Sequence, residues 1–429
     1  GDPLLPVGGR FVGNYLAGIY DTADGTLRER EIVNAPNWAL IRCWVDGELV
    51  DPTTGEILSF QRWMNFREAV LHREMIWRSP GGKRIQIHTS RFVSMDDYHA
   101  GFVLWKLQAL DACEIMVQSG IDADVINTQK DHFRRVSSET IPGGIYLEAE
   151  THEMQYRMGT AVSHSTCLPE GVEFSNQRDI LGELHALVQY DLHLESEESF
   201  ELVKYAAVYT SRDTAELRES CESALEKHTA FSYEACQRVH LERWERLWRT
   251  ADFAVQGDKE VQIGMRCAIY HLINSAPHHS DSVSYPARSL SGQDHWGTIH
   301  WDTEIFILPF FTYQFPDAAR NMLIYRHRGL QGAREKAQEL GFKGTFYAWR
   351  SHEDDGKERC PWRVNKNVLT GRYIRNYFRD RQIHISADIV YAVWQYFEAT
   401  ADMEFLEEYG AEMVLEAARF YASRVIYDS

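Results

Sequence analysis

Hydrophobic and polar residues alternate with a period of two from the start of the chain to about residue 210. The alternating segments are short, and turn residues separate them, as expected for β-strands. The clearest of these segments are residues 84–89, 101–107, 144–149, 186–192 and 202–209. Because the strands follow one another without intervening helices, the pattern predicts an antiparallel β-sandwich as the N-terminal domain, residues 1–210.

The period changes at Asp213, where Glu216 follows three residues later with the spacing of a helix-capping box. From Asp213 to Trp248 the chain contains no Pro or Gly, and apolar residues recur at helical spacing. This pattern predicts a helical linker over residues 211–256.

The remainder of the chain, residues 257–429, predicts long helices joined by large loops. Two irregular stretches, 276–300 and 341–383, are rich in Gly, Ser, His, Trp and charge, and loops of that size are usually functional. Helical hairpins with such loops at one end indicate an α-toroid, here with too few hairpins to close the ring. The helical candidates are residues 259–275, 303–315, 317–340, 386–400 and 403–425.

Length and composition narrow the possible functions. A chain of 429 residues exceeds what one hydrophobic core usually supports, so we expect at least two folded units. The net charge of −18 and the scattered basic residues argue against a nucleic-acid partner. The chain lacks an apolar run of roughly 20 residues and a signal pattern, so we expect a cytoplasmic protein with no membrane partner.

The seven cysteines are widely spaced and form neither a C-x-x-C pair nor a Cys/His cluster. They are therefore expected to be free thiols, and no metal site is predicted. Aromatic residues make up 12% of the chain. This content suits surfaces on which sugars stack, although large aromatic cores explain it equally well.

The sharpest local signal is the segment 300–311, HWDTEIFILPFF, where a polar loop enters an apolar helix. Asp302 and Trp301 together suit a pyranose ring, since a carboxylate accepts hydrogen bonds from sugar hydroxyls and an indole covers the apolar C–H face. The alternative is that Asp302 or Thr303 only caps the helix and Trp301 packs in the core.

This segment also carries a family resemblance. Residues 286–292 (PARSLSG) followed by residues 297–304 (GTIHWDTE) resemble the signature of glycoside hydrolase family 65, in which P-A-R-x-L-S-G leads into G-H-x-F-W-D-T-E. The resemblance covers nearly the whole chain in the family's order. It extends to NAPNW at 34–38, RFVSM at 91–95, the histidine and tryptophans of 240–248, DIVYAVWQY at 388–396 and EAARF at 416–420.

The resemblance implies a β-sandwich, a helical linker and an (α/α)6 barrel that is incomplete in this chain, with the sugar held in the barrel's mouth. It assigns Asp302, with Trp301 beside it, to the non-reducing glucose, and Glu304 to a structural partner. The family's Y-P-W-E element resembles residues 347–350, YAWR. Trp349 is therefore expected to pack on the glucose, while Arg350 stands where the family has an acid.

Three further positions follow from the resemblance. His384, in a stretch that resembles E-x-H-I-x-A-D-I, is expected to face the site, with a helix-capping or core position as the alternative. The loop 352–358 is expected to shape the pocket for the leaving sugar, or else to be a solvated charge run. The basic and aromatic residues 372–379 indicate an acceptor-side loop or a subunit contact, and we expect a homodimer.

The function that the resemblance implies is an inverting α-glucoside phosphorylase, which cleaves a disaccharide with inorganic phosphate and needs no other cofactor. The alternatives are a family 65 α-glucoside hydrolase and a catalytically inactive carbohydrate-binding relative. In the family the general acid is a glutamate in a G-P-D-E-like stretch, expected here beyond Ser429. No catalytic residue is therefore assigned, and nothing in the sequence favours Glu304, Glu353 or Glu358 as a substitute.

Overall fold

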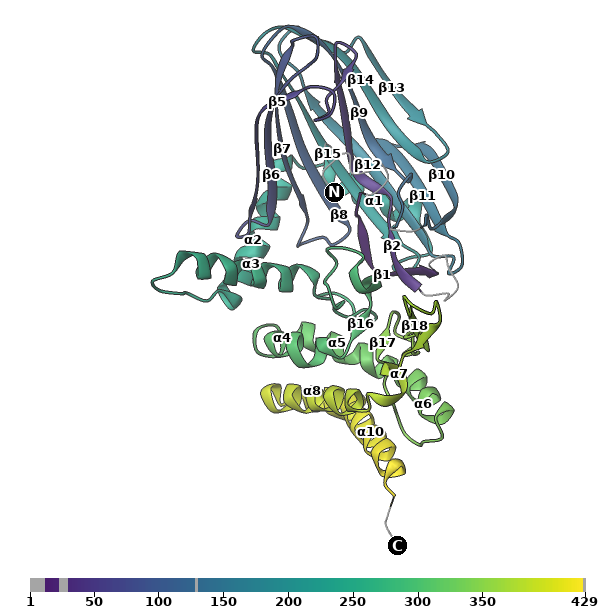
Figure 1. The fold of residues 1–429 in the computed structure, drawn as a ribbon. Helices are drawn as coiled ribbons and strands as arrows, with labels where there is room; N and C mark the ends of the chain where they lie inside the picture. The colour runs from purple at the N-terminus through teal and green to yellow at the C-terminus, as the bar shows by residue number, and fades with distance from the viewer. Residues whose placement is uncertain (1–11, 23–29, 128–129, 427–429) are drawn as a thin grey trace. The chain divides into compact units, whose positions relative to one another are not determined.

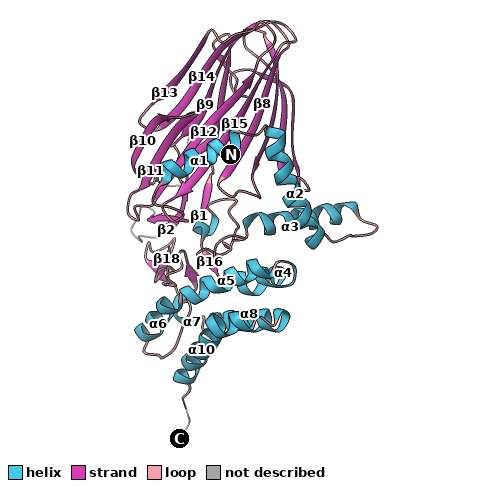
Figure 2. Cartoon of the chain, turned by 180° about the vertical axis from the view of Figure 1, so that it is seen from behind, coloured by secondary structure: helices cyan, strands magenta, loops and turns pink. Residues whose placement is uncertain are grey.

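The computed structural model describes residues 12–22, 30–127 and 130–426, which form two compact units. The strand unit contains the described residues of 1–14 and 34–267, and the helical unit contains those of 15–33 and 268–429. Figure 1 follows the chain from its strands to its helices, and Figure 2 distinguishes the two by colour.

The strand unit is built from two antiparallel sheets that share one hydrophobic core, to which Trp77 of one sheet and Val117 of the other both contribute. The first sheet contains, in spatial order, β10 (Phe133–Ile141), β11 (Gly144–Thr151), β12 (Arg157–Cys167), β15 (Ser199–Thr210), β8 (Ala100–Ala109), β7 (Arg84–Val93), β6 (Val70–Arg78) and β5 (Glu56–Asn65). The second contains β13 (Asn176–Leu181), β14 (His185–Leu194), β9 (Cys113–Asp122), β3 (Asn37–Val45) and β4 (Glu48–Leu49).

Two helices, α1 (Leu217–Thr229) and α2 (Tyr233–Ala251), follow the last strand of this unit. The capping box predicted at Asp213 is wrong. The Asp213 carboxylate instead accepts hydrogen bonds from the backbone N–H of Thr210 at 2.8 Å and from its hydroxyl at 2.7 Å, so this local turn competes with the cap and α1 starts only at Leu217. The Ser232 side chain caps α2 by accepting from Ala235 N–H.

The helical unit combines an N-terminal strand pair with the helices of the second half of the chain. A core that includes Phe311, Met322, Ile389 and Val393 joins these helices. The elements are β1 (Tyr15–Thr22), β2 (Arg30–Asn34), α3 (Lys259–Ser275, which starts in the strand unit), β16 (Ile299–His300), α4 (Leu308–Gln314), α5 (Pro316–Arg328), α6 (Leu330–Glu339), β17 (Arg350–Ser351), β18 (Arg363–Lys366), β19 (Tyr373–Arg375), α7 (Phe378–Arg381), α8 (His384–Thr400), α9 (Met403–Phe405) and α10 (Ala411–Arg424).

The predicted order of strands first and helices afterwards is confirmed, and each clear strand segment lies in a strand. The helix predicted over 317–340 is divided at Gly329 into α5 and α6. A Cβ at Gly329 would lie 2.8 Å from the Cα of Gly356, so the backbone of the later loop passes too close for any side chain. The (α/α)6 barrel, incomplete in this chain, and the domain bounds at residues 210 and 256 stay predictions.

Candidate functional site

A two-residue ladder brings the two predicted sugar-binding elements together. β16 pairs antiparallel with β17, with Ile299 opposite Ser351 and His300 opposite Arg350. Trp301 and Asp302 directly follow β16, and Trp349 directly precedes Arg350 of β17. The ring of His384 lies 4.9 Å from that of Trp301, at 88° to it. All five residues predicted to bind sugar (Trp301, Asp302, Trp349, Arg350 and His384) therefore lie on or beside this ladder.

Asp302 stands between the ladder and a π-helical turn, Thr303–Ile307, that leads into α4. Its partly buried side chain makes no capping hydrogen bond, and the hydroxyl of Thr303 donates to the carbonyl of Tyr285 at 2.8 Å. The capping alternative thus finds no support in the structure. Sugar binding by Asp302 stays a prediction.

Glu304, two residues further on, has a different environment. Its carboxylate is fully buried and accepts two hydrogen bonds from the Arg326 guanidinium, both at 2.7 Å. Burial raises the pKa of the Glu304 carboxyl, and the opposite charge of Arg326 counteracts this rise. Arg326 also donates to the carbonyl of His300 at 2.9 Å. The ion pair therefore fixes the backbone of the ladder to α5, the structural role expected for Glu304.

Trp349 is partly buried between two aromatic rings. Phe378 stacks on its indole with ring centroids 5.0 Å apart, and His300 meets it nearly edge-on at 4.6 Å. Burial, followed by the charge of Arg350, lowers the pKa of His300 to about 3, so this imidazole is neutral at pH 7. A sugar would have to meet Trp349 on the part of the ring that Phe378 and His300 leave open.

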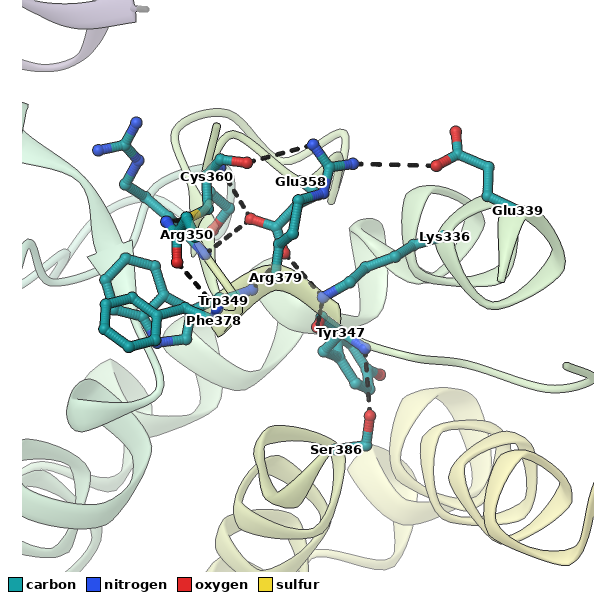
Figure 3. A network of polar contacts seen from close by, with 12 residues as sticks. Lys336, Glu339, Tyr347, Trp349, Arg350, Glu358, Cys360, Phe378, Arg379 and Ser386 are labelled. Carbon is teal, nitrogen blue, oxygen red and sulfur yellow. Dashed lines mark hydrogen bonds and ion pairs between the residues drawn. The ribbon is translucent and has the colours of Figure 1, made fainter. Parts of the chain in front are cut away.

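Glu358 and Lys336 form a second buried ion pair, 2.7 Å between Oε2 and Nζ, beside the Trp349 segment (Figure 3). The same carboxylate accepts hydrogen bonds from the backbone N–H groups of Trp349 at 2.8 Å, Arg350 at 3.2 Å and Cys360 at 2.9 Å. With four donors on one carboxylate, Glu358 anchors the segment and is not placed to deliver a proton.

The sequence interpretation missed Lys336. Burial lowers the pKa of its ammonium group, and the charge of Glu358 opposes this shift. Lys336 shares the buried face of α6 with Ala333 and Ala337, at the i, i+3 and i+4 spacing of one helical face. A lysine on an otherwise small and apolar face was the signal that could have identified it.

Glu353, the third acid considered as a substitute, is bound by two arginines. It accepts from Arg30 of β2 at 2.7 Å and from Arg359 at 3.0 Å. The carboxylates of Glu304, Glu353 and Glu358 are thus all held in ion pairs. Over the part of the chain that the structure describes, no group of His, Cys, Asp and Glu residues has the arrangement of a metal site.

Arg350 and His384 are the remaining two residues predicted to bind the sugar. The buried side chain of Arg350 points away from Glu358 (Figure 3), donates to the carbonyl of Arg359 at 2.9 Å and lies 4.5 Å from the ring centre of Trp296. His384 is exposed at the first position of α8, with its Nδ1 2.6 Å from Oδ2 of Asp388. The core alternative for His384 is therefore wrong.

Two family models match the chain along most of its length. The N-terminal domain of glycosyl hydrolase family 65 matches residues 7–247, and the central catalytic domain of the same family matches residues 266–429. The chain belongs to glycosyl hydrolase family 65.

Relatives in family 65 include several phosphorylases. The chain is 34% identical to the kojibiose phosphorylase of Halothermothrix orenii over an alignment of 427 residues, which covers 97% of this chain and 54% of the relative. It is 34% identical to the nigerose phosphorylase of Lachnoclostridium phytofermentans, covering 95% of this chain and 56% of the relative. It is 35% identical to the 1,2-α-glucosylglycerol phosphorylase of Bacillus selenitireducens, covering 95% of this chain and 52% of the relative. The chain thus spans about half the length of these relatives.

A solved structure shows the same fold. It comes from a human-microbiome protein proposed to be a kojibiose phosphorylase, with a TM-score of 0.85 and 21% identity, covering 98% of this chain and 55% of that one. Among the described helices, none is long and apolar enough to cross a bilayer.

The chain departs from the family 65 signature within the ladder itself. The pattern G-H-x-F-W-D-T-E has His where this chain has Thr298, and Phe where it has His300. The Thr298 hydroxyl and Nε2 of His300 lie 2.9 Å apart, so the two exchanged positions contact each other. In this chain the imidazole beside Trp349 is that of His300, two residues after the position at which the signature has His.

Proposed function

We propose that the full-length protein containing this chain is an inverting α-glucoside phosphorylase that converts an α-linked disaccharide or glucoside and inorganic phosphate into β-glucose 1-phosphate and the released acceptor. The observation that carries the proposal is the family 65 match over both domains, with phosphorylases among relatives at 34–35% identity. The ladder supports it, because it gathers the predicted sugar-binding residues into one place.

In the proposed reaction, Asp302 accepts hydrogen bonds from hydroxyls of the non-reducing glucose, and the indoles of Trp301 and Trp349 contact its apolar C–H groups. Phosphate attacks the anomeric carbon from the face opposite the departing oxygen, so the configuration changes from α to β. A general acid protonates the departing oxygen as its bond to carbon breaks. We propose that this acid is a glutamate beyond Ser429, because Glu304, Glu353 and Glu358 are held in ion pairs.

The finer expectations belong to the same proposal. The helical unit would form part of an (α/α)6 barrel, phosphate would be the co-substrate without a further cofactor, and two copies would form a homodimer in the cytoplasm. We also propose that the N-terminal domain is a β-sandwich, and the two sheets with one shared core support this.

The test is to incubate the full-length protein with a panel of α-glucosides, with and without phosphate, and to identify the products. Phosphate-dependent release of β-glucose 1-phosphate is expected. Equal release of free glucose with and without phosphate would identify a hydrolase. Binding of a glucoside without turnover of any panel member would identify an inactive carbohydrate-binding relative.

A further inference from the structure

The turn that leads into the ladder carries an exposed tryptophan on an unusual backbone. His295 and Trp296 both have left-handed backbone angles, with φ of 54° and 56°, and Gly297 follows at 67°. Residues other than glycine disfavour this conformation, and it persists only where the surroundings enforce it. Trp296 is nevertheless 37% exposed, so its own burial does not explain the strain.

The surroundings of this turn fix it from several sides. Trp296 N–H donates to Gln293 O at 2.7 Å, and the Thr298 hydroxyl donates to His295 O at 2.6 Å. The hydroxyl of Tyr20 in β1 donates to Gly297 O at 2.7 Å. The strand pair of the helical unit therefore holds the turn, and with it the position of the indole.

Arg350 packs its guanidinium against the indole of Trp296. Its guanidinium lies 4.5 Å from the ring centre of Trp296, while its backbone pairs with His300 in the ladder. A cation close to the face of an indole attracts the ring and so favours one orientation of it, and 37% of Trp296 remains exposed in that orientation. No described residue accepts a hydrogen bond from the indole N–H of Trp296. This donor is therefore available to a hydroxyl group.

We propose that Trp296 is an additional sugar-stacking platform, supported by Arg350, that binds the apolar face of a pyranose ring beside the ladder. Arg350 links this platform to the candidate sugar site, because its side chain contacts Trp296 and its backbone pairs with His300 in the ladder. The inference rests on the proposed function for its location. The pyranose is either the glucose that is transferred or the sugar that is released, and the test distinguishes the two.

The chain offers a matched control in Trp362. This tryptophan is 42% exposed and lies over another arginine, Arg379, at 4.2 Å from the ring centre, but it is not part of the ladder. The variants to compare in the full-length protein are Trp296→Ala, Trp296→Phe, Arg350→Met and Trp362→Ala. Calorimetric titration with glucose in the absence of phosphate measures binding without turnover.

Trp296→Ala is expected to weaken glucose binding by about tenfold, and Trp296→Phe by less, because a smaller ring retains part of the stacking. The loss of glucose affinity in Arg350→Met should lie between those of Trp296→Phe and Trp296→Ala. Trp362→Ala should bind glucose as the wild type does. In the synthetic direction, a higher KM for β-glucose 1-phosphate alone would place the platform at the transferred glucose. A higher KM for the acceptor sugar alone would place it at the released sugar.

Unchanged glucose binding by Trp296→Ala would overturn the proposal, and so would an equal loss in Trp362→Ala. A lower melting temperature with unchanged binding would mean that Trp296 only covers Arg350. Because calorimetry needs no turnover, a protein that binds glucose through Trp296 but releases no glucose 1-phosphate would contradict the proposed function and leave the platform intact.

Discussion

Among the residues that the structure describes, each unit buries one lysine, and the two lysines have different hydrogen-bond partners. Lys204 of β15 is fully buried and donates to three backbone carbonyls, those of Trp38 at 3.0 Å, Leu40 at 2.6 Å and Gly120 at 3.0 Å. Lys336 of α6 is 3% exposed and donates to the Glu358 carboxylate and to one backbone carbonyl.

The difference lies in what each lysine connects. Lys204 extends from the eight-stranded sheet to β3 and β9 of the five-stranded sheet, so its hydrogen bonds tie the two sheets together. Lys336 holds Glu358, and that carboxylate holds the backbone of Trp349. Equal burial therefore has different consequences: the first lysine supports the fold alone, and the second also supports the proposed sugar site.

The largest effect is expected from Asp302→Ala, which changes the proposed sugar site and leaves both lysines in place. A charged hydrogen bond contributes about 1.5–3 kcal/mol, so losing two to sugar hydroxyls lowers kcat/KM by roughly 10²- to 10⁴-fold. Steady-state phosphorolysis by the full-length protein measures this loss. The melting temperature should stay near that of the wild type, and near-normal activity would remove Asp302 from the site.

Lys336→Met is expected to reduce both stability and activity. Removing one partner of a buried ion pair costs about 3–5 kcal/mol, and here the three N–H groups on Glu358 place the loss near the lower limit. Denaturant unfolding gives the free energy, and KM for the glucoside at a temperature where the variant is folded gives the effect on Trp349. An unchanged KM would mean that Lys336, like Lys204, stabilises the fold without affecting the sugar site.

Lys204→Met is expected to reduce stability by about 1–3 kcal/mol, because three buried carbonyls lose their donor, and to leave activity per folded molecule unchanged. Burial lowers the pKa of Lys204 well below its usual value. Between the folded and unfolded pKa values the unfolded chain binds more protons, so the unfolding free energy of the wild type rises with pH in that window. Unfolding curves recorded up to pH 10 should show this rise in the wild type and lose it in Lys204→Met. A loss of activity in this variant would contradict the division between the two lysines.

The smallest effect is expected from Asp97→Asn, at a partly exposed carboxylate of the strand unit. The hydrogen bond from His228 at 3.0 Å, together with Lys227, holds the pKa of Asp97 well below its usual range despite partial burial. This carboxylate therefore stabilises the fold above the unfolded pKa of about 4, and its contribution declines as the pH falls towards the folded value. Asp97→Asn should cost about 1 kcal/mol at pH 7, with the difference shrinking below pH 4. A difference that persisted unchanged at pH 2 would exclude a charge effect.

Local periodicity was sufficient to predict most of the elements, because burial on one face of a strand or helix leaves a repeating pattern. Residues 84–89 lie in β7, and residues 259–275 coincide with α3. It failed at Asp213, where a short-range hydrogen bond to Thr210 replaced the expected cap. It failed again at Gly329, where α5 ends and α6 begins, and where the later chain at Gly356 lies too close for any side chain.

The candidate site could be predicted only in part. The residue types around Trp301 and Asp302 indicated sugar binding, and the resemblance added Trp349, Arg350 and His384. The pairing of β16 with β17 depends on a register between distant segments, which neither periodicity nor motif spacing encodes. From the sequence alone, charged residues such as Lys336 and Glu358 would be expected at the surface, because the partner of each lies in another segment of the chain.

The strand pair β1–β2 also constrains how the protein is made. Its residues up to Val33 belong to the helical unit, whose next residue is Ala268, so the 234 residues 34–267 separate the two parts. At a synthesis rate of about 5–20 residues per second, the ribosome needs roughly 10–50 s to cover that distance. During this interval the nascent chain displays Ile19 and Ile32, both fully buried in the finished protein, without the partners that bury them. All residues of the strand unit are synthesised before this point, whereas the first strands cannot be buried in the helical unit until residues after 267 have been made.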